Sequence, residues 1–321
     1  MINAILKDVL LGKELGFEEA MKLLGSEQVD LPLLMHAANK IRHDHCGDRI
    51  DLCSLINAKS GLCKEDCKFC AQSAKYNTGC SVYPLVDTEK IIEEARIAKK
   101  NGATNFCIVI SGTGPTKEDF KKIKLAIEKI KKEVGINVDC SLGKLDEDMA
   151  KALVSLGIER YNHNLETSED FYKSICSTHN YSSRLGSTKM LKDTGLDLCC
   201  GGIIGLGESN VDRLNLAFTL KELGVGCVPI NILDPRKGTP LENVKQLSPL
   251  DIIKVVAVFR LILKKAIIKV AGGRESVLGD LQSLAFMAGA NGMIIGGYLT
   301  TKGRSVEEDL KMVKDLGFKT K

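Results

Sequence analysis

The feature that most restricts the fold of this chain is a repeated alternation between short apolar runs and longer amphipathic stretches. Eight apolar runs of strand length recur along the 321 residues, with a spacing near the roughly 30 residues of a βαβ unit. The predicted strands cover residues 50–56, 105–110, 136–142, 160–166, 196–204, 227–233, 266–272 and 293–296. Because this alternation gives a parallel sheet that eight units can close, we predict an α/β fold of the TIM-type (β/α)8 barrel class, with an open doubly wound sheet as the alternative.

The stretches between the predicted strands repeat their apolar residues at helical spacing. The predicted helices cover residues 89–100, 117–133, 147–156, 183–193, 211–223, 250–265 and 277–288, with a last helix at 306–316. Thr116 and Ser209 precede helices as caps, and Gly102 follows one. Residues 1–46 also carry a helical pattern, so we expect an N-terminal helical extension there and one barrel domain over 47–321 that includes the C-terminal helix.

Composition and charge exclude several classes of protein. The 45 Lys and Arg residues nearly balance the 41 Asp and Glu residues and are scattered along the chain, which argues against nucleic acid as a partner. No apolar run reaches the roughly 18 residues that span a bilayer, and the first residues lack the order of a signal peptide. We therefore expect a cytoplasmic protein without a membrane partner, in which the 12 cysteines are metal ligands or buried thiols.

Three cysteines, Cys63, Cys67 and Cys70, closely follow the first predicted strand. Thiolates this close repel one another unless a metal neutralises them, and soft sulfur ligands favour zinc, copper(I) or iron-sulfur clusters. A structural zinc site normally has four protein ligands, whereas a four-iron cluster held by three cysteines leaves one iron open to a small molecule. With Phe69 the pattern is C-x3-C-x-Phe-C, which resembles the signature of the radical S-adenosylmethionine (SAM) enzymes and predicts a [4Fe-4S] cluster. A zinc loop and a chance cluster are the alternatives.

Four further cysteines, Cys107, Cys140, Cys199 and Cys227, fall on four different predicted strands. Alternate residues of a barrel strand point inward, so these sulfurs can converge although they are distant in the sequence. A single cysteine in a strand is more often a small buried apolar residue. Four of them, together with the three-cysteine loop, predict a second metal centre deep in the barrel.

Polar residues alternate along the fourth predicted strand. Asn162, Asn164 and Glu166 share one face of that strand, and burying them costs free energy unless they hydrogen-bond a partner. A ribose or a urea-like group would supply such bonds, and mutual pairing within a polar core is the alternative. His163 lies on the opposite face of an ideal strand, where we expect a packed histidine rather than a base.

A glycine-rich segment, residues 201–208, ends the fifth predicted strand. Glycines there allow a ligand to approach the backbone, and Glu208 begins the next helix, where the helix dipole favours a carboxylate. A tight turn without a ligand is the alternative. The segment is similar to the G-x-I-x-G-x-x-E motif of radical SAM enzymes, where it borders the adenine. This similarity implies the cofactor-binding residues Gly201, Ile203, Gly205 and Glu208.

The motifs occur in the order seen in biotin synthases, which the chain resembles from about residue 51 to residue 317. They comprise the three-cysteine loop and residues 161–166, 201–208, 228–231, 237–240 and 273–275. The resemblance implies that reductive cleavage of SAM gives a 5′-deoxyadenosyl radical that takes hydrogen from dethiobiotin, and that an auxiliary iron-sulfur cluster donates the sulfur closing the ring of biotin. It also implies a homodimer and an electron donor such as flavodoxin or ferredoxin.

The resemblance assigns roles to individual residues. The ligands of the [4Fe-4S] cluster would be Cys63, Cys67 and Cys70, and those of the auxiliary cluster Cys107, Cys140 and Cys199. Asn164 would contact both SAM and dethiobiotin, and Asn231 would face dethiobiotin. Glu166 would hold the ribose of SAM, although the family usually has an aspartate there.

The chain departs from the family at Lys269, where well-known members have an arginine ligand of a [2Fe-2S] cluster. Lysine lacks the planar fork of arginine, and its ammonium must lose a proton before it can bind iron. Cys227 has the same strand parity as Asn231, whereas Cys200 is the competing fourth ligand. We therefore expect an auxiliary centre with four cysteine ligands, of four-iron type, with Lys269 as a charged catalytic residue beside it.

Two other classes of function remain as alternatives. A relative of the hydrogenase-maturase or methylornithine-synthase type would keep the three-cysteine loop without needing the cysteines and asparagines of the barrel strands. A non-enzymatic iron-sulfur carrier or zinc-stabilised scaffold would need neither polar residues lining a barrel nor an open coordination site.

Overall fold

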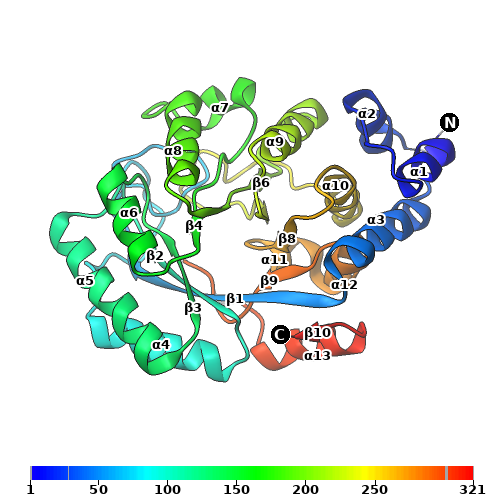
Figure 1. Ribbon diagram of the computed structural model, residues 1–321. Helices are drawn as coiled ribbons and strands as arrows, with labels where there is room; N and C mark the ends of the chain where they lie inside the picture. The colour runs from blue at the N-terminus through cyan, green and yellow to red at the C-terminus, as the bar shows by residue number, and fades with distance from the viewer. Residues whose placement is uncertain (1, 28, 301–302, 321) are drawn as a thin grey trace.

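The apolar runs form parallel strands that close into a barrel in the computed structural model, which describes residues 2–27, 29–300 and 303–320 (Figure 1). Strand β1 pairs in parallel with β2 on one side and with β9 on the other, which closes the ring. The predicted TIM-type barrel is thereby confirmed. The strands are β1 (Arg49–Lys59), β2 (Asn105–Ile110), β3 (Asn137–Ser141), β4 (Arg160–Asn162), β5 (Asp197–Cys199), β6 (Gly202–Ile204), β7 (Cys227–Ile232), β8 (Ile267–Val270), β9 (Gly292–Ile294) and β10 (Lys319–Thr320).

Two predicted strands differ most from the observed ones. β4 ends at Asn162, and the run 196–204 is divided into β5 and β6, which both pair with β7 and share one position in the barrel. The division arises because the Gly201 amide donates to Asn164 Oδ1 at 3.2 Å instead of to a strand neighbour. A side chain thus replaces part of the ladder, so the buried backbone group stays bonded.

Helices alternate with the strands and cover the outside of the barrel (Figure 1). They are α1 (Ile2–Leu10), α2 (Phe17–Gly25), α3 (Leu31–Cys46), α4 (Thr88–Lys100), α5 (Lys117–Lys129), α6 (Glu147–Ser155), α7 (Glu169–Ile175), α8 (Tyr181–Asp193), α9 (Asn210–Glu222), α10 (Pro249–Ile262), α11 (Arg274–Leu278), α12 (Gln282–Met287) and α13 (Val306–Asp315). The predicted caps Thr116 and Ser209 accept hydrogen bonds from Asp119 N and Asp212 N. The short helix α7 is not predicted from the sequence.

The N-terminal helices lie on one side of the barrel, where α3 packs along α10 (Figure 1). Residues 252–262 of α10 are buried with the exception of Lys254, which is partly exposed. A helix that is apolar on nearly all sides must be covered on its outer face. The extension over residues 2–46 therefore completes the core instead of forming a separate body.

The C-terminal segment returns to the start of the barrel, where β10 pairs with β1 through Arg49 and Lys319. Arg274 at the start of α11 bonds Asp309 of α13 at 2.6 Å, and both side chains are fully buried. This ion pair fixes α13 beneath the barrel wall. Among the described residues, no helix is both long and apolar enough to cross a membrane.

Candidate active site

A cavity of about 530 Å³ lies inside the barrel, a volume typical of small-molecule sites. We call it the barrel cavity. Its lining contains the three loop cysteines, polar side chains after β4, and cysteines of the barrel strands. These residues are Cys63, Cys67, Cys70, Asn162, His163, Asn164, Glu166, His179, Arg184, Ile203, Asn231, Lys269, Cys53, Cys107 and Cys199.

The loop after β1 turns its three cysteines toward the barrel cavity. Cys63 N donates to Gln72 O at 3.1 Å, and Cys70 N donates to Cys67 O at 2.9 Å. Gly61 and Leu62 both have positive φ, of 75° and 53°, a conformation that is unfavourable for leucine. The loop is therefore held in a tight, specific turn.

A segment more than 100 residues away fixes this loop. We call residues 175–179, which begin at the last residue of α7, the tether segment. Its amides at Ser177 and Thr178 donate to Asp66 Oδ1 at 2.9 and 3.1 Å, and Lys68 N donates to Ile175 O at 2.8 Å. Burial alone would raise the pKa of Asp66, but the hydrogen bonds from Ser177 and Thr178 lower it below its ordinary value. The carboxylate is thus a charged anchor between two distant parts of the chain.

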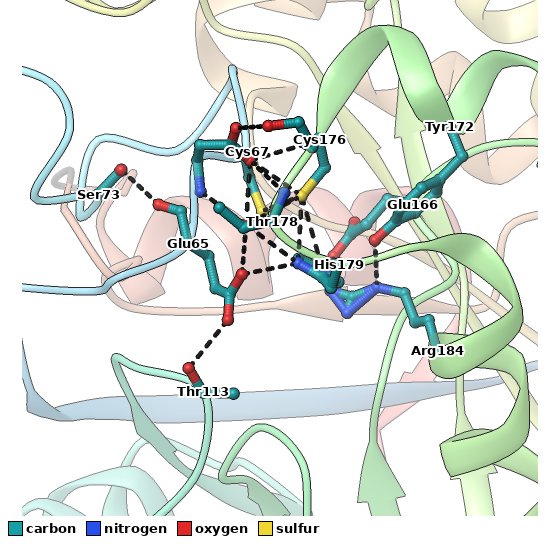
Figure 2. Close-up of polar contacts among 12 residues, drawn as sticks. Glu65, Cys67, Ser73, Thr113, Glu166, Tyr172, Cys176, Thr178, His179 and Arg184 are labelled. Carbon is teal, nitrogen blue, oxygen red and sulfur yellow. Dashed lines mark hydrogen bonds and ion pairs between the residues drawn. The ribbon is translucent and has the colours of Figure 1, made fainter.

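The tether segment also brings a second thiol and an imidazole to the loop (Figure 2). Cys176 Sγ lies 3.9 Å from Cys67 Sγ and 3.1 Å from His179 Nδ1, and this nitrogen lies 2.9 Å from Glu65 Oε2. The hydrogen bond from Cys67, with that from His179, lowers the pKa of Cys176 to about 4. The sequence interpretation left Cys176 without a role, although its spacing of three residues from His179 was a usable signal.

The residues after β4 form a polar wall of the barrel cavity. Glu166 is buried and has φ of 71°, and its Oε1 lies 3.3 Å from Arg184 Nη2. Burial raises the pKa of Glu166, whereas the Arg184 guanidinium opposes that rise. Within the described residues its Oε2 has no hydrogen-bond partner, so this oxygen is free to accept a bond from a ligand hydroxyl.

His163 lines the same cavity as Asn162, because β4 ends there and strict alternation of sides ends with it. The expectation that His163 lies on the opposite face is therefore corrected. Burial lowers its pKa to about 3, so the ring is neutral at pH 7.

Only one of the four predicted residues in the glycine-rich segment reaches the barrel cavity, namely Ile203. A Cβ on Gly201 would lie 2.0 Å from Pro229 O, so this glycine is needed for strand packing. Gly205 N donates to Glu208 Oε1 at 2.9 Å, and Glu208 also bonds Arg213 Nε at 2.6 Å. The structure does not bring Gly201, Gly205 and Glu208 to the cavity lining, because Gly201 packs against β7 between β5 and β6, and Gly205 and Glu208 form a closed turn between β6 and α9.

Asn231 lies on β7, which only the shared position of β5 and β6 separates from β4. Its side chain lines the barrel cavity and is held by two backbone groups. Its Oδ1 accepts from Gly272 N at 3.1 Å, and its Nδ2 donates to Gly202 O at 3.2 Å. These bonds fix the orientation of the amide without occupying all of its donors and acceptors.

Deeper in the barrel, four buried cysteines of different strands come together. Cys199 and Cys227 occupy paired positions of β5 and β7, and their sulfurs lie 3.4 Å apart. Cys53 of β1 and Cys107 of β2 belong to one buried cluster, and Asn162 Nδ2 donates to Cys107 Sγ at 3.3 Å. Cys53 was missed from the sequence, although its even spacing from Leu55 and Asn57 on β1 was a usable signal.

Cys140 is not part of this group. The register of β2 and β3 pairs Cys107 with Asp139, and Cys140 with Ile108. Because neighbouring residues of a strand point to opposite faces, Cys140 packs in the main core and does not line the cavity. Cys200 is likewise buried outside the cavity lining. The expectation that Cys107, Cys140 and Cys199 converge is thus corrected for Cys140.

A buried lysine lies beside the four strand cysteines. Lys269 Nζ lies 2.8 Å from Asp51 Oδ1, and Arg160 Nη1 lies 3.7 Å from Asp51 Oδ2. Burial alone would lower the pKa of Lys269, but the sulfurs of Cys227 and Cys53 and the Asp51 carboxylate raise it above its ordinary value. The ion pair with Asp51 at 2.8 Å thus holds Lys269 as an ammonium ion, which has no lone pair to give to a metal.

The arrangement suits two sulfur-ligated metal centres facing one ligand-sized space. The loop group consists of Cys63, Cys67 and Cys70, and the strand group of Cys53, Cys107, Cys199 and Cys227. Thiolates are ligands for iron-sulfur clusters, and the unpaired oxygen of Glu166 with the asparagine amides can bind hydroxyl or ureido groups between them. The donor sets thus fit such clusters.

Comparisons with known proteins agree with this arrangement. A model of the radical SAM superfamily matches residues 59–220, and a model of the biotin and thiamin synthesis associated domain matches residues 229–319. The chain is 46% identical over 316 residues to the biotin synthase of Pelotomaculum thermopropionicum, covering 98% of each chain. It is 47% identical over 320 residues to that of Carboxydothermus hydrogenoformans, covering 99% of this chain and 98% of the relative.

Solved structures resemble the chain in fold. A crystal structure of methylornithine synthase has a TM-score of 0.86 at 22% identity, covering 99% of this chain and 97% of that chain. The FeFe-hydrogenase maturase HydG of Carboxydothermus hydrogenoformans has a TM-score of 0.85 at 21% identity, covering 99% of this chain and 79% of that chain. At these identities the likeness concerns the barrel alone.

Proposed function

The chain belongs to the biotin synthase family of radical SAM enzymes, and from this premise we infer how its barrel cavity converts dethiobiotin into biotin. When bound, the [4Fe-4S] cluster and SAM supply the radical that removes hydrogen from dethiobiotin, and the auxiliary cluster supplies the sulfur. The protein residues bind and orient the cofactors and the substrate and exclude water. The observation that carries this assignment is that the three loop thiols and three strand thiols line one cavity of about 530 Å³, with Cys227 directly behind Cys199 at 3.4 Å between the sulfurs.

The loop group holds the [4Fe-4S] cluster in this proposal, and the residues after β4 hold SAM. Glu166 accepts from the ribose hydroxyls, because one of its oxygens has no other partner among the described residues. Arg184 keeps this carboxylate oriented from 3.3 Å away. Ile203 provides an apolar contact for the adenine at the edge of β6.

The strand group holds the auxiliary cluster, with Cys53 in place of the Cys140 expected from the sequence. Four thiols on β1, β2, β5 and β7 give the all-cysteine ligand set expected of a four-iron cluster, whereas the [2Fe-2S] cluster of well-known family members has an arginine ligand. Their complete burial excludes water from the sulfur to be transferred. This divergence from the family is supported by the ammonium state of Lys269.

Lys269 acts as a positive charge beside the auxiliary cluster. Four thiolates on a cluster carry excess negative charge, and a buried ammonium ion stabilises it through the low-dielectric interior. The carboxylate of Asp51 holds Lys269 Nζ at 2.8 Å. Lys269 is thus a positioning and electrostatic residue and not an iron ligand.

Dethiobiotin lies between the two groups in this proposal. Asn231 presents its fixed amide to the ureido ring, whose N–H and C=O groups match the donor and acceptor of the amide. Asn164 lies near Asn231, bonded to Gly201 next to the Gly202 carbonyl that Asn231 bonds, where it can contact both SAM and dethiobiotin. Substrate held in this position has the loop group on one side and the strand group on the other.

An acidic electron donor of the flavodoxin or ferredoxin type fits the outside of the loop group. Lys64, Lys68 and Lys75 are exposed, whereas the neighbouring Glu65 and Asp66 are partly buried and bonded to the tether segment. The loop therefore presents mainly positive charge near the cluster. A homodimer and a cytoplasmic location are further proposals from family membership, the latter supported by free cysteines at all 12 positions.

Anaerobic turnover tests the proposed function directly. The reconstituted protein is given SAM, dethiobiotin and a reductant, and biotin, 5′-deoxyadenosine, iron and sulfide are measured on the same sample. We expect biotin together with 5′-deoxyadenosine. Cleavage of SAM without conversion of dethiobiotin would favour an activity of the methylornithine-synthase or hydrogenase-maturase type, and absence of cleavage would favour an iron-sulfur carrier.

A further inference from the structure

A group of metal-binding side chains lies beside the loop group and has no part in the function proposed above. Cys176 and His179 come from the tether segment, and Cys67 comes from the loop (Figure 2). Their ligand atoms all lie within 4.8 Å of one another. One of the three residues, Cys67, is shared with the proposed [4Fe-4S] cluster, whereas the other two are unassigned.

The distances agree with a single tetrahedral ion. Metal–sulfur bonds of about 2.3 Å place two sulfurs about 3.8 Å apart, and a metal–nitrogen bond of about 2.0 Å places sulfur and nitrogen about 3.5 Å apart. Cys67 Sγ and Cys176 Sγ are separated by 3.9 Å. Cys176 Sγ lies 3.1 Å from His179 Nδ1, so this pair needs to separate by only a few tenths of an ångström to hold an ion.

Glu65 orients the imidazole for this purpose. Its Oε2 lies 2.9 Å from His179 Nδ1, and Thr113 Oγ1 donates to the other carboxylate oxygen at 2.9 Å. The same nitrogen lies 3.1 Å from Cys176 Sγ. Nδ1 is therefore the nitrogen that can join the two sulfurs on a metal, and Glu65 holds the ring with this nitrogen toward them.

The site is organised by bonds that do not involve its ligand atoms. The backbone amides of Ser177 and Thr178 donate to Asp66, and Cys176 N donates to Tyr172 O at 3.2 Å. Cys67 and His179 line the barrel cavity, and the His179 side chain is 23% exposed. An ion can therefore enter from the cavity without rearrangement of the tether segment.

We propose that Cys67, Cys176 and His179 bind one divalent ion such as Fe²⁺, with Glu65 orienting His179, before the [4Fe-4S] cluster is assembled. A water molecule or a further ligand completes the tetrahedron. Because Cys67 belongs to both sites, occupation by the single ion and by the cluster exclude each other. This loading role depends on the proposed function of Cys67 as a cluster ligand, whereas binding of the ion itself does not.

Titration of the cluster-free, full-length protein with Co²⁺ alone under anaerobic conditions tests the site. The background variant C63S/C70S removes the other two loop thiols and keeps all three proposed ligands. We expect one Co²⁺ per chain with thiolate-to-cobalt charge-transfer absorption and the visible bands of a four-coordinate ion. Adding Cys176→Ser to this background should remove these bands. Any Co²⁺ absorption from the buried strand cysteines should be the same in both samples.

Two further variants separate metal binding from a fold defect. His179→Gln should weaken Co²⁺ binding strongly, and Glu65→Gln should weaken it about 10- to 100-fold, as is typical of residues that support a ligand. Cys80→Ser, outside the group, is the matched control and should bind as its parent does. Equal Co²⁺ binding with and without Cys176, or loss of the bands in C63S/C70S itself, would overturn the proposal.

The loading role has its own measurement. Wild-type protein given Fe²⁺ before sulfide should assemble the loop cluster faster than protein given both together, and Cys176→Ser should abolish that advantage. An unchanged advantage in Cys176→Ser would refute loading. Normal biotin formation without Co²⁺ binding would refute this inference alone, whereas Co²⁺ binding without biotin formation would refute only the proposed function.

Discussion

The loop group and the strand group contain the same ligand chemistry, but different physical interactions position them. Cys63, Cys67 and Cys70 are half-buried and lie on a loop whose shape depends on a few hydrogen bonds to a distant segment. The strand cysteines are buried, and the register of the barrel fixes them. A loop can open to exchange SAM and products, whereas a strand position keeps a sulfur source dry and immobile.

The largest expected effect comes from a substitution that disrupts the loop group alone. Cys70→Ser removes a ligand of the [4Fe-4S] cluster, so SAM cleavage should fall to background and about four iron atoms per chain should be lost. The absorption of the auxiliary centre should remain, because Cys70 lies on the loop after β1 and not on the strands that carry the strand group. Cys80→Ser is the control and should cleave SAM normally. Simultaneous loss of both centres would show that the two groups are not independent.

The opposite experiment disrupts the strand group and leaves the loop group intact. It compares Cys227→Ser with Cys140→Ser. Cys227→Ser should abolish biotin formation and alter the iron and sulfide of the auxiliary centre, while cleavage of SAM continues. Cys140→Ser should leave that centre intact, since the register directs this side chain away from the cavity. An intact auxiliary centre in Cys227→Ser would remove Cys227 from the ligands, and its loss in Cys140→Ser would contradict the observed register.

The charges of the strand group should affect stability as well as catalysis. Lys269→Met leaves the buried Asp51 without its closest cation, which costs about 3–5 kcal/mol of unfolding free energy when a buried pair loses one partner. Denaturant unfolding measures this loss, and K269M/D51N should recover much of it. The loss should be far larger than that of a surface pair such as Lys151 and Glu147. An equal loss in K269M and K269M/D51N would show that this ion pair is not the cause.

A smaller effect concerns SAM binding beside the loop group. Glu166→Gln removes the charged acceptor, and a hydrogen bond to a charged group contributes about 1.5–3 kcal/mol. SAM affinity should therefore fall roughly 10- to 150-fold. Glu166→Asp, which restores the usual residue of the family, should retain most of the affinity in an equilibrium binding measurement. Equal losses in both variants would point to packing rather than charge.

The smallest effect is a pH dependence of stability from the same side chain. Burial raises the pKa of Glu166 in the folded protein, so its contribution to stability is complete below the ordinary value of about 4.3 and is lost as pH rises through the raised value. Glutamine does not titrate. The unfolding free energy of Glu166→Gln should therefore increase relative to wild type as pH rises above about 4.3. A difference independent of pH would contradict the raised pKa.

The fold was largely predictable because hydrophobic periodicity is a local property of the sequence. β2 begins and ends where its apolar run does, and the caps Thr116 and Ser209 act as predicted. The ends of β4 and the division between β5 and β6 were not predictable. They depend on the bond from Gly201 N to Asn164 Oδ1, whose partners are 37 residues apart.

The sequence by itself determined the chemistry of this protein, because the spacing of Cys63, Cys67 and Cys70 restricts the sulfurs to one small loop. Only the tertiary structure decided which other cysteines can join them. Cys140 follows Asp139, the residue paired with Cys107, and therefore points into the outer core. Cys53 and Cys107 fall on the same face of β1 and β2 and belong to one buried cluster. The contact of Cys176 with Cys67 spans 109 residues, and no local pattern encodes such a distance because it results from the packing of the whole barrel.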